Sequence, residues 1–301
     1  MNQPAAPFLT IITPVYNRAS LLGACYESLC RQTELDFEWI VVDDGSTDGS
    51  AELAEAFAAD RFPITVIRKE NGGKHTAINA AIPRIRGDYV LFLDSDDTLT
   101  EDAAMQVRSA WAQHSADPTV GVLIFLRGTP GGDPFCTVAD YGVPVDLLRY
   151  RRDRRISTDC CEVLRAELLR QYPFPEFAGE RFLAECALWN RIARSHKCVY
   201  IDRIIYLCAF LEDGLTSAGR RLRIQCPRGG MFTSELRIHS NNSLPQRCKY
   251  AMLYCCYGFF AGLSPRLILT GEPGCLWLKA LALAPGYALY LRWKKHHGTL
   301  A

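Results

Sequence analysis

Short apolar runs alternate with longer, more polar segments through the first hundred residues. Each run is rich in strand-forming residues and is closed by Pro, Gly, Asn or Asp, so it predicts a buried strand. We expect these strands over residues 8–13, 37–42, 64–68 and 89–93. The segments between them predict helices over residues 21–32, 51–59 and 76–82. Strands that alternate with helices in this way predict a parallel sheet with helices on both faces.

The pattern becomes less regular after residue 100. A helix is expected over residues 101–114, a strand over 120–126 and a strand pair over 200–211. A cluster of Arg residues over 149–155 has two interpretations, a solvated loop or a contact with phosphate groups of a ligand.

Charge is distributed unevenly along the chain. The 301 residues have a formal net charge of only +1, yet twelve Lys or Arg residues follow Ser217, against Glu235 and Glu272 alone. The front of the chain is therefore acidic and the tail basic, which predicts different partners for the two parts. An acidic substrate, nucleic acid or an anionic membrane surface would each suit such a tail.

Two apolar blocks, 250–263 and 275–291, lie within the basic tail. The first is shorter than the roughly 20 residues needed to span a bilayer. The second contains Lys279 and a predicted break at Pro285–Gly286, and Arg292–His297 follows it. Apolar stretches flanked by aromatic and basic residues predict helices that lie on an anionic membrane. The alternative is ordinary packing against the preceding domain.

The cysteines and the N-terminal sequence indicate the cellular compartment of the protein. There are 13 cysteines at irregular spacings, and no basic segment followed by an apolar one opens the chain as in a secretory signal. We therefore expect reduced thiols and a cytoplasmic protein, with the inner face of the plasma membrane as the site of any peripheral contact.

Polar residues follow each of the first four predicted strands. The four groups are Tyr16–Asn17, Asp43–Asp44, Asn71–Lys74 and Asp94–Asp96. The carboxyl ends of parallel strands lie along one edge of a sheet, which is where α/β folds bind ligands. Helix caps alone would not bring together an aromatic residue, a Gly-Gly-Lys turn and two Asp pairs. The pattern therefore predicts a nucleotide in a crevice at this edge.

The most distinctive of these ends is Asp94-Ser-Asp96. Two carboxylates just beyond a buried strand suit Mg2+ or Mn2+ shared with phosphate oxygens. The alternative is a turn or a helix cap, because Asp is common in both after a strand.

These motifs together resemble the family-2 glycosyltransferases of the GT-A fold. The resemblance rests on Thr13–Asn17, Val41–Asp48, Asn71–Lys74 and Asp94–Asp97, and it extends more loosely to about residue 220. It implies an α/β, Rossmann-like fold with a mostly parallel central sheet, flanked by helices and followed by a helical C-terminal extension. It also implies a nucleoside-diphosphate sugar donor, Mn2+ or Mg2+, and inversion at the anomeric carbon.

The resemblance assigns roles to individual residues. Asp44 accepts a hydrogen bond from the base, commonly uracil, and Asp96 is the direct metal ligand, with Asp94 beside it. Asp213 stands near a position where the family often has a metal-directed His, although a turn Asp before Gly is an equal alternative. The remaining donor-binding residues implied are Pro14, Tyr16, Asn17, Asp43, Ser46, Asn71, Gly73, Lys74 and Ser95.

The family also places an acidic catalytic base shortly before a Leu-Trp-x-Arg-like stretch. Aligned on Leu188–Arg191, that position is Glu185. The family more often has Asp there, preceded by Glu, whereas Ala184 stands before Glu185, and Glu180 is the alternative base. A carboxylate suits the role because it accepts the proton of the acceptor hydroxyl during attack.

The sequence thus predicts a metal-dependent inverting glycosyltransferase that acts on a glycan or lipid-linked acceptor in cell-surface polysaccharide synthesis. We expect residues 1–216 to form the catalytic domain, with a donor half at 1–100 and an acceptor half at 101–216. Residues 217–301 form the extension, and nucleic acid is not expected as a partner. Two rivals stay open. One is a nucleotide-sugar-binding protein without a base, and the other is an aspartyl phosphatase, whose motif Leu91–Leu99 resembles except that Asp97 replaces its Gly.

Overall fold

The chain separates into two compact units. Unit 1 is Met1–Phe174 with Ser195–Phe210, and unit 2 is Pro175–Arg194 with Leu211–Ala301. The structure, a computed structural model, describes residues 6–57, 61–154, 156, 158–208, 215–239, 242–271 and 275–297. Residues 175–194 thus group with the C-terminal helices, whereas the sequence places them in the catalytic domain.

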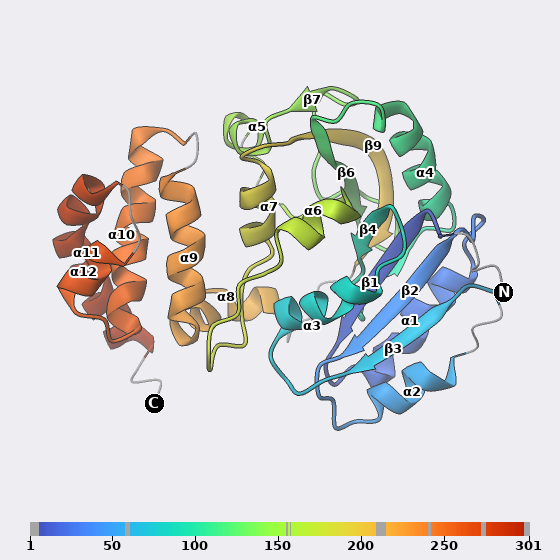
Figure 1. Cartoon of the computed structure of the whole chain (residues 1–301), viewed down its shortest axis with the longest axis horizontal. Helices are drawn as coiled ribbons and strands as arrows, with labels where there is room; N and C mark the ends of the chain where they lie inside the picture. The colour runs from blue at the N-terminus through green and yellow to red at the C-terminus, as the bar shows by residue number, and fades with distance from the viewer. Residues whose placement is uncertain are drawn as a thin grey trace. The chain divides into compact units, whose positions relative to one another are not determined.

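Unit 1 is built around one mixed sheet (Figure 1). Its strand order is β3-β2-β1-β4-β8-β6-β9-β5, and β7 pairs with β9. The strands are β1 (Leu9–Val15), β2 (Phe37–Asp43), β3 (Ile64–Arg68), β4 (Tyr89–Phe92), β5 (Thr98–Leu99), β6 (Val120–Gly128), β7 (Pro144–Val145), β8 (Cys161–Arg165) and β9 (Lys197–Leu207). The first four pair in parallel, with Leu9 opposite both Phe37 and Tyr89, as the alternating pattern predicts.

The second half of the sheet adds antiparallel neighbours. Strand β8 runs antiparallel to both β4 and β6, and β5 and β7 run antiparallel to β9, while β6 and β9 are parallel. Of the strand pair predicted over 200–211, residues 209–211 lie outside the described residues, and over 200–208 the prediction is wrong, because β9 is a single strand of 11 residues. Register shifts where it pairs with β6 let it curve, so its end also reaches β5.

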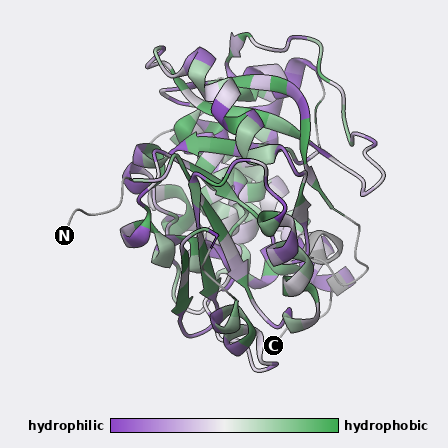
Figure 2. Ribbon diagram, turned by 90° about the vertical axis from the view of Figure 1, so that its right-hand side faces the viewer, coloured by the Kyte–Doolittle hydropathy of each residue, from purple (hydrophilic) through white to green (hydrophobic). Residues whose placement is uncertain are grey.

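Helices cover the sheet of unit 1 (Figure 1). They are α1 (Ala19–Cys30), α2 (Ser50–Ala56), α3 (Lys74–Ala81), the short 3-10 helix η1 (Ile82–Arg84), α4 (Ala103–His114), α5 (Leu147–Asp153) and α6 (Ala166–Gln171). The four helices expected from the sequence are present, with ends displaced by a few residues. Figure 2 shows that the strands between them are mainly hydrophobic, as expected for a sheet covered on both faces.

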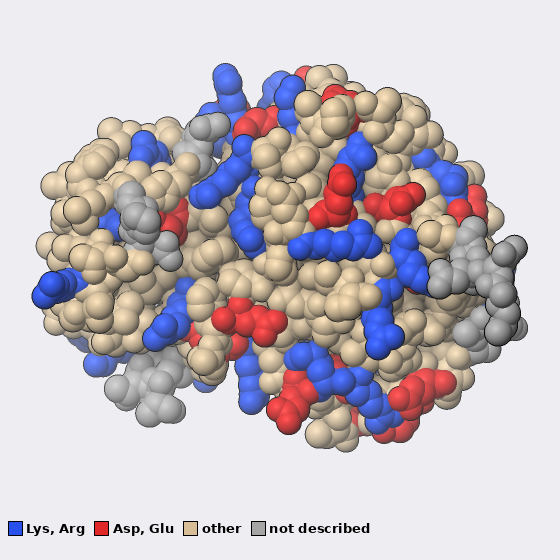
Figure 3. All heavy atoms as spheres, viewed as in Figure 1, with Lys and Arg blue, Asp and Glu red and all other residues tan. Residues whose placement is uncertain are grey.

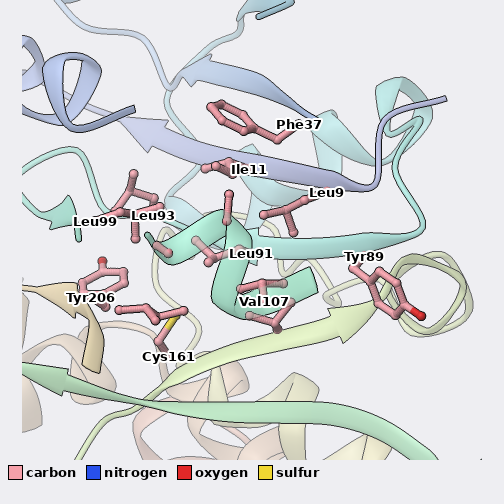
Figure 4. Packing of buried hydrophobic residues seen from close by; sticks show 14 of the residues in the cluster. Leu9, Ile11, Phe37, Tyr89, Leu91, Leu93, Leu99, Val107, Cys161 and Tyr206 are labelled. Carbon is pink, nitrogen blue, oxygen red and sulfur yellow. The ribbon is translucent and has the colours of Figure 1, made fainter. Parts of the chain in front are cut away.

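One continuous apolar core fixes the strands in place (Figure 4). Leu9 and Ile11 of β1 share a face and are almost fully buried. They pack with Phe37 of β2, Leu91 of β4 and Val107 of α4. Each such side chain contributes about 1.5–3 kcal/mol on burial, so this cluster holds the strand ends, and the loops after them, in fixed positions.

Unit 2 is helical in its described part. Its helices are α7 (Cys186–Ile192), α8 (Leu215–Gln225), α9 (Pro227–Ile238), α10 (Leu244–Phe260), α11 (Pro265–Thr270) and α12 (Leu276–His297). The expected break at Pro285–Gly286 is wrong, because α12 continues through Pro285. Gly286 permits close packing there, since a Cβ would lie 2.6 Å from the Cβ of Cys255 on α10. Within the described ranges, no helix is long and apolar enough to span a bilayer.

Candidate active site

The loops after β1, β2, β3 and β4 are joined to one another by hydrogen bonds. Asn17 links the first loop to the second, Asp44 links the second to the third, and Lys74 links the third to Asp94 in the fourth. The residues that the sequence places at one sheet edge therefore do come together. Each link is described in turn below.

Asn17 fixes the first loop against the second. Its backbone is left-handed, with φ 51°, which Asn tolerates better than most residues. Its N–H donates to the hydroxyl of Ser46 at 2.9 Å, and its Oδ1 accepts the N–H of Thr47 at 2.8 Å. The neighbouring Tyr16 is left 49% exposed, although it is a large aromatic residue. An exposed ring beside a rigid loop is available for stacking on a planar ligand.

Asp44 organises the third loop. One carboxylate oxygen accepts the N–H of Gly72 at 2.9 Å, and the other accepts the N–H of Gly73 at 2.7 Å. Lys69 adds an ion pair of 2.7 Å, and Asn71 donates from its side chain to the Asp44 carbonyl at 2.9 Å. Both carboxylate oxygens already accept hydrogen bonds. A nucleotide base would therefore donate its hydrogen bond to one of the remaining lone pairs of Asp44.

Two glycines make this arrangement possible. Gly45 and Gly73 have φ of 79° and 93°, in the left-handed region that other residues rarely adopt. A Cβ on Gly45 would lie 2.8 Å from the backbone nitrogen of Asn71. The backbones of the second and third loops thus approach each other more closely than a side chain would allow.

The two lysines of the third loop take different partners. Lys69 binds Asp44, whereas Lys74 forms an ion pair with Asp94. The side chains of Lys74 and Asp94 are about one quarter exposed, so the pair is partly accessible to solvent. The sequence motif includes Lys74 but not Lys69. Lys69 directly follows the third strand, as the other residues at the strand ends follow theirs, and this position is the signal that would have identified it.

Tyr206 and Arg127 stabilise Asp94. The Tyr206 hydroxyl accepts the backbone N–H of Asp94 at 2.9 Å, and the Arg127 guanidinium lies 4.1 Å from the centre of the Tyr206 ring. Burial would raise the pKa of Asp94, but the charges of Lys74 and Arg127 outweigh it and hold that pKa below its ordinary value. Both supporting residues lie in apolar strands, so no local motif reveals them.

Asp97 differs from its two neighbours. It is buried, and its N–H donates to the carbonyl of Asp94 at 3.1 Å, which closes the turn. Burial and the negative charge of Asp94 raise the pKa of Asp97 to about 7. Asp97 is therefore expected to be partly protonated near neutral pH when no metal is bound.

The residues present fit a metal ion that is shared with a ligand. The described ranges contain no cluster of three or more His, Cys, Asp or Glu that would enclose a cation. Asp96 is partly exposed, and its side chain forms no hydrogen bond or ion pair with the described residues. Mg2+ is commonly bound by one or two carboxylates together with substrate phosphates, and Asp96 with Asp94 supplies that donor set. Asp213 lies outside the described residues.

The two candidate bases belong to unit 2, whereas the four loops belong to unit 1. Glu185 directly precedes α7, and its carbonyl accepts the N–H of Leu188 at 2.9 Å. Glu180 has a structural role, because its carboxylate accepts the N–H groups of Arg228 at 2.7 Å and Gly229 at 2.8 Å, at the start of α9. Burial raises the pKa of Glu180 despite these two bonds.

The mixed sheet, its flanking helices and the polar loops at the ends of its parallel strands are typical of the GT-A glycosyltransferase fold. Residues 10–171 match the model of the family described as glycosyl transferase family 2. The chain belongs to glycosyl transferase family 2.

Individual relatives agree with this assignment. The glycosyltransferase GlyG of Streptococcus pneumoniae serotype 4 is 27% identical over 212 residues, which is 66% of this chain and 69% of GlyG. Other curated relatives are matched over half of their own length or less.

Two solved structures share the fold. One is S. aureus TarS, residues 1–349, in complex with UDP. It has a TM-score of 0.64 at 16% identity and covers 96% of this chain and 92% of the TarS chain. The mannosyltransferase PcManGT of Pyrobaculum calidifontis, in complex with GDP-Man and Mn2+, has a TM-score of 0.56 at 20% identity. It covers 97% of this chain and 87% of its own.

Proposed function

We propose that this glycosyltransferase transfers a sugar from a nucleoside-diphosphate sugar, with uridine diphosphate as the expected nucleotide, and inverts the anomeric carbon. The observation that carries the proposal is the continuous hydrogen-bonded connection from Asn17 through Asp44 and Lys74 to Asp94. Four loops held in this way preorganise base, ribose and diphosphate contacts before the donor arrives.

The first two loops form the nucleoside end of the site. The Tyr16 ring and Pro14 flank the base, and Asp44 accepts from it while holding the Gly72–Gly73 turn. Asn17, Asp43 and Ser46 keep these groups in position, since Asp43 accepts the Ser46 N–H at 3.2 Å and Ser46 accepts from Asn17. Asn71 and Gly73 border the ribose or the diphosphate.

The fourth loop forms the diphosphate end. When the donor binds, the Lys74 ammonium shifts part of its interaction from Asp94 to a donor phosphate, because a phosphate carries more charge than one carboxylate. Asp96 and Asp94 would hold Mn2+ or Mg2+, with Ser95 between them. When bound, the ion would supply positive charge to offset the charge that develops on the leaving diphosphate. The Mn2+ in the PcManGT complex supports a divalent ion in this fold.

Glu185 is the proposed catalytic base. Its carboxylate accepts the proton of the acceptor hydroxyl as that oxygen attacks the anomeric carbon from the face opposite the diphosphate. We prefer Glu185 to Glu180 because both oxygens of Glu180 already accept backbone N–H groups of α9. Asp213 stays a further proposed metal ligand.

The acceptor is proposed to be a glycan or a lipid-linked glycan in cell-surface polysaccharide synthesis. The catalytic site is proposed to face the cytoplasm, and the basic tail to contact the inner face of the plasma membrane. The relation to GlyG supports glycosyl transfer itself.

A thermal-shift panel of nucleoside-diphosphate sugars, with and without Mn2+, tests the donor. We expect one uridine-linked donor to raise the melting temperature, and to raise it more with Mn2+. The Asp96→Ala variant should lose the Mn2+ increment, and Glu70→Gln, an exposed carboxylate near the third loop, should keep it. Absence of any shift with every donor would reject the proposal. Binding without transfer to any acceptor would instead favour the nucleotide-sugar-binding alternative.

A further inference from the structure

The outer face of α12 is apolar along most of its length. Exposed Leu276, Trp277, Leu281, Tyr287 and Leu291 follow one another at helical spacing, and Leu281 is 71% exposed. Ala280, Ala284 and Ala288 lie exposed between them. Water-exposed apolar faces of this extent mark interaction sites in proteins.

Lys279, the one charged residue in this part of α12, does not interrupt the face. It is fully buried, and its ammonium lies 2.9 Å from Glu235 of α9 and 4.5 Å from the ring centre of Tyr254. The buried charge is thus neutralised inside the helical unit. The outward face from Leu276 to Leu291 carries no charge, which the sequence, with Lys279 in the middle of the block, does not show.

Basic residues border the C-terminal end of this face. Arg292, Lys294 and Lys295 lie in the last turns of α12 and are exposed. Among the described residues of 215–297 the single acidic residue is Glu235, which is bound to Lys279 and His239. The visible surface of these helices in Figure 3 is accordingly mostly tan and blue.

A hollow of about 550 Å³ lies beside the C-terminal end of α12. Arg220, Lys249, Arg292 and His296 line it together with Trp293, whose ring lies 4.9 Å below the Arg220 guanidinium. Cationic groups around an aromatic and aliphatic floor suit a phosphate that is attached to an acyl chain.

We infer that α12 is a membrane-binding helix that lies flat on an anionic lipid bilayer. Leu276–Leu291 enter the acyl boundary, and Arg292, Lys294, Lys295 and the adjoining hollow bind lipid headgroup phosphates. At about 1.5 Å per residue, its 22 residues would extend about 33 Å along the surface. The inference rests on the proposed function and deepens it, because an enzyme bound to this surface would meet a lipid-linked acceptor there.

The test is flotation of the full chain with vesicles of phosphatidylcholine alone, and of phosphatidylcholine mixed with phosphatidylglycerol. We expect binding to the anionic vesicles, weakened by salt. Leu281→Asp should lower the partition coefficient about tenfold or more, since it replaces an apolar side chain on the inserted face by a charge. Met105→Asp on α4, an exposed apolar residue of unit 1, is the matched control and should bind as the wild type does.

Lipids brominated on the acyl chain add a readout of depth. They should quench tryptophan fluorescence on binding. Trp277→Phe should reduce the quenching, and Trp277→Phe combined with Trp293→Phe should remove most of it, because the other three tryptophans, Trp39, Trp111 and Trp189, are buried. No flotation on anionic vesicles, or flotation unchanged by Leu281→Asp, would overturn the inference. A dimer that Leu281→Asp converts to a monomer, without flotation, would show that a second copy covers the face.

These outcomes are separable from the proposed function. Vesicle binding needs no donor, so Asp96→Ala should float as the wild type does while losing the Mn2+-dependent donor shift. Loss of donor binding with intact flotation would reject the proposed function alone, and the reverse result would reject the membrane inference alone.

Discussion

The hydroxyl of Tyr206 accepts the backbone N–H of Asp94 at 2.9 Å, across 112 positions of sequence. Strand β9 thereby fixes the turn that carries Asp94 and Asp96, two of the proposed metal ligands. Tyr206 is fully buried in the main core, where it is labelled in Figure 4, so its hydroxyl has little freedom to move. The position of the Asp94–Asp96 turn thus depends on a residue outside every motif.

Tyr206→Phe should weaken Mn2+-dependent donor binding and lower stability. It leaves the Asp94 N–H without its acceptor, which costs about 1–3 kcal/mol for a buried donor. Urea denaturation and the donor thermal shift measure the two effects. Tyr200→Phe is the matched control, because Tyr200 is a buried tyrosine of the same strand whose hydroxyl accepts from Arg151 at 3.3 Å. It should affect stability alone, and equal donor binding in both variants would contradict the role of Tyr206.

Asp44→Asn should weaken donor binding about tenfold or more. An amide group still accepts at its oxygen, but its NH2 faces a backbone N–H or Lys69, so one of the bonds that hold the Gly72–Gly73 turn is lost. Isothermal titration with the donor measures the change. Glu70→Gln removes the same charge from an exposed position in the same loop and should bind normally. A similar loss in both variants would mean that net charge, rather than loop geometry, determines affinity.

Asp96→Asn and Glu185→Gln should separate binding from turnover. The first should abolish Mn2+-dependent binding and transfer, and the second should bind donor normally while kcat falls by 100-fold or more, on the order expected for loss of a general base. Glu180→Gln should lower the melting temperature, since Glu180 binds two N–H groups of α9, yet keep the kcat of the folded fraction. Retained turnover in Glu185→Gln would exclude Glu185 as the base.

The contribution of Asp97 to the stability of the metal-free protein should fall as pH rises toward neutrality. The folded-state pKa of Asp97 is raised from 3.8 to about 7, so its contribution to stability is fully present below 3.8 and is lost as pH rises through about 7. The slope from this group is at most about 1.4 kcal/mol per pH unit. Urea denaturation in EDTA measures it, and Asp97→Asn, which does not ionise, should show a flatter profile. Identical profiles would contradict the assignment.

Lys279→Met should destabilise the protein by about 3–5 kcal/mol, because it leaves the largely buried charge of Glu235 with the His239 ring as its remaining ion-pair partner among the described residues. The double variant Lys279→Met with Glu235→Leu should recover much of this loss, since both buried charges are then absent. Chemical denaturation measures all three proteins. A double variant as unstable as the single one would mean that the ion pair itself, rather than the isolated charge, matters for folding.

The sequence by itself determined the first half of the fold and which residues at the strand ends lie together. Alternating apolar runs predicted β1 to β4 and their helices, because strands covered on both faces must be apolar throughout. The polar groups at the strand ends then identified Asn17, Asp44, Lys74 and Asp94 as neighbours, since parallel strands end at one edge.

Tertiary structure alone decided which of these groups bind each other and which residues support them. Lys69 rather than Lys74 binds Asp44, and Tyr206 positions Asp94, because such partners are set by packing between segments far apart in the chain. The charge of Lys279 and the ring of Pro285 suggested an interrupted apolar block. In the folded unit Glu235 neutralises that charge inside the bundle, and α12 continues past the proline with an outward face that is uncharged from Leu276 to Leu291.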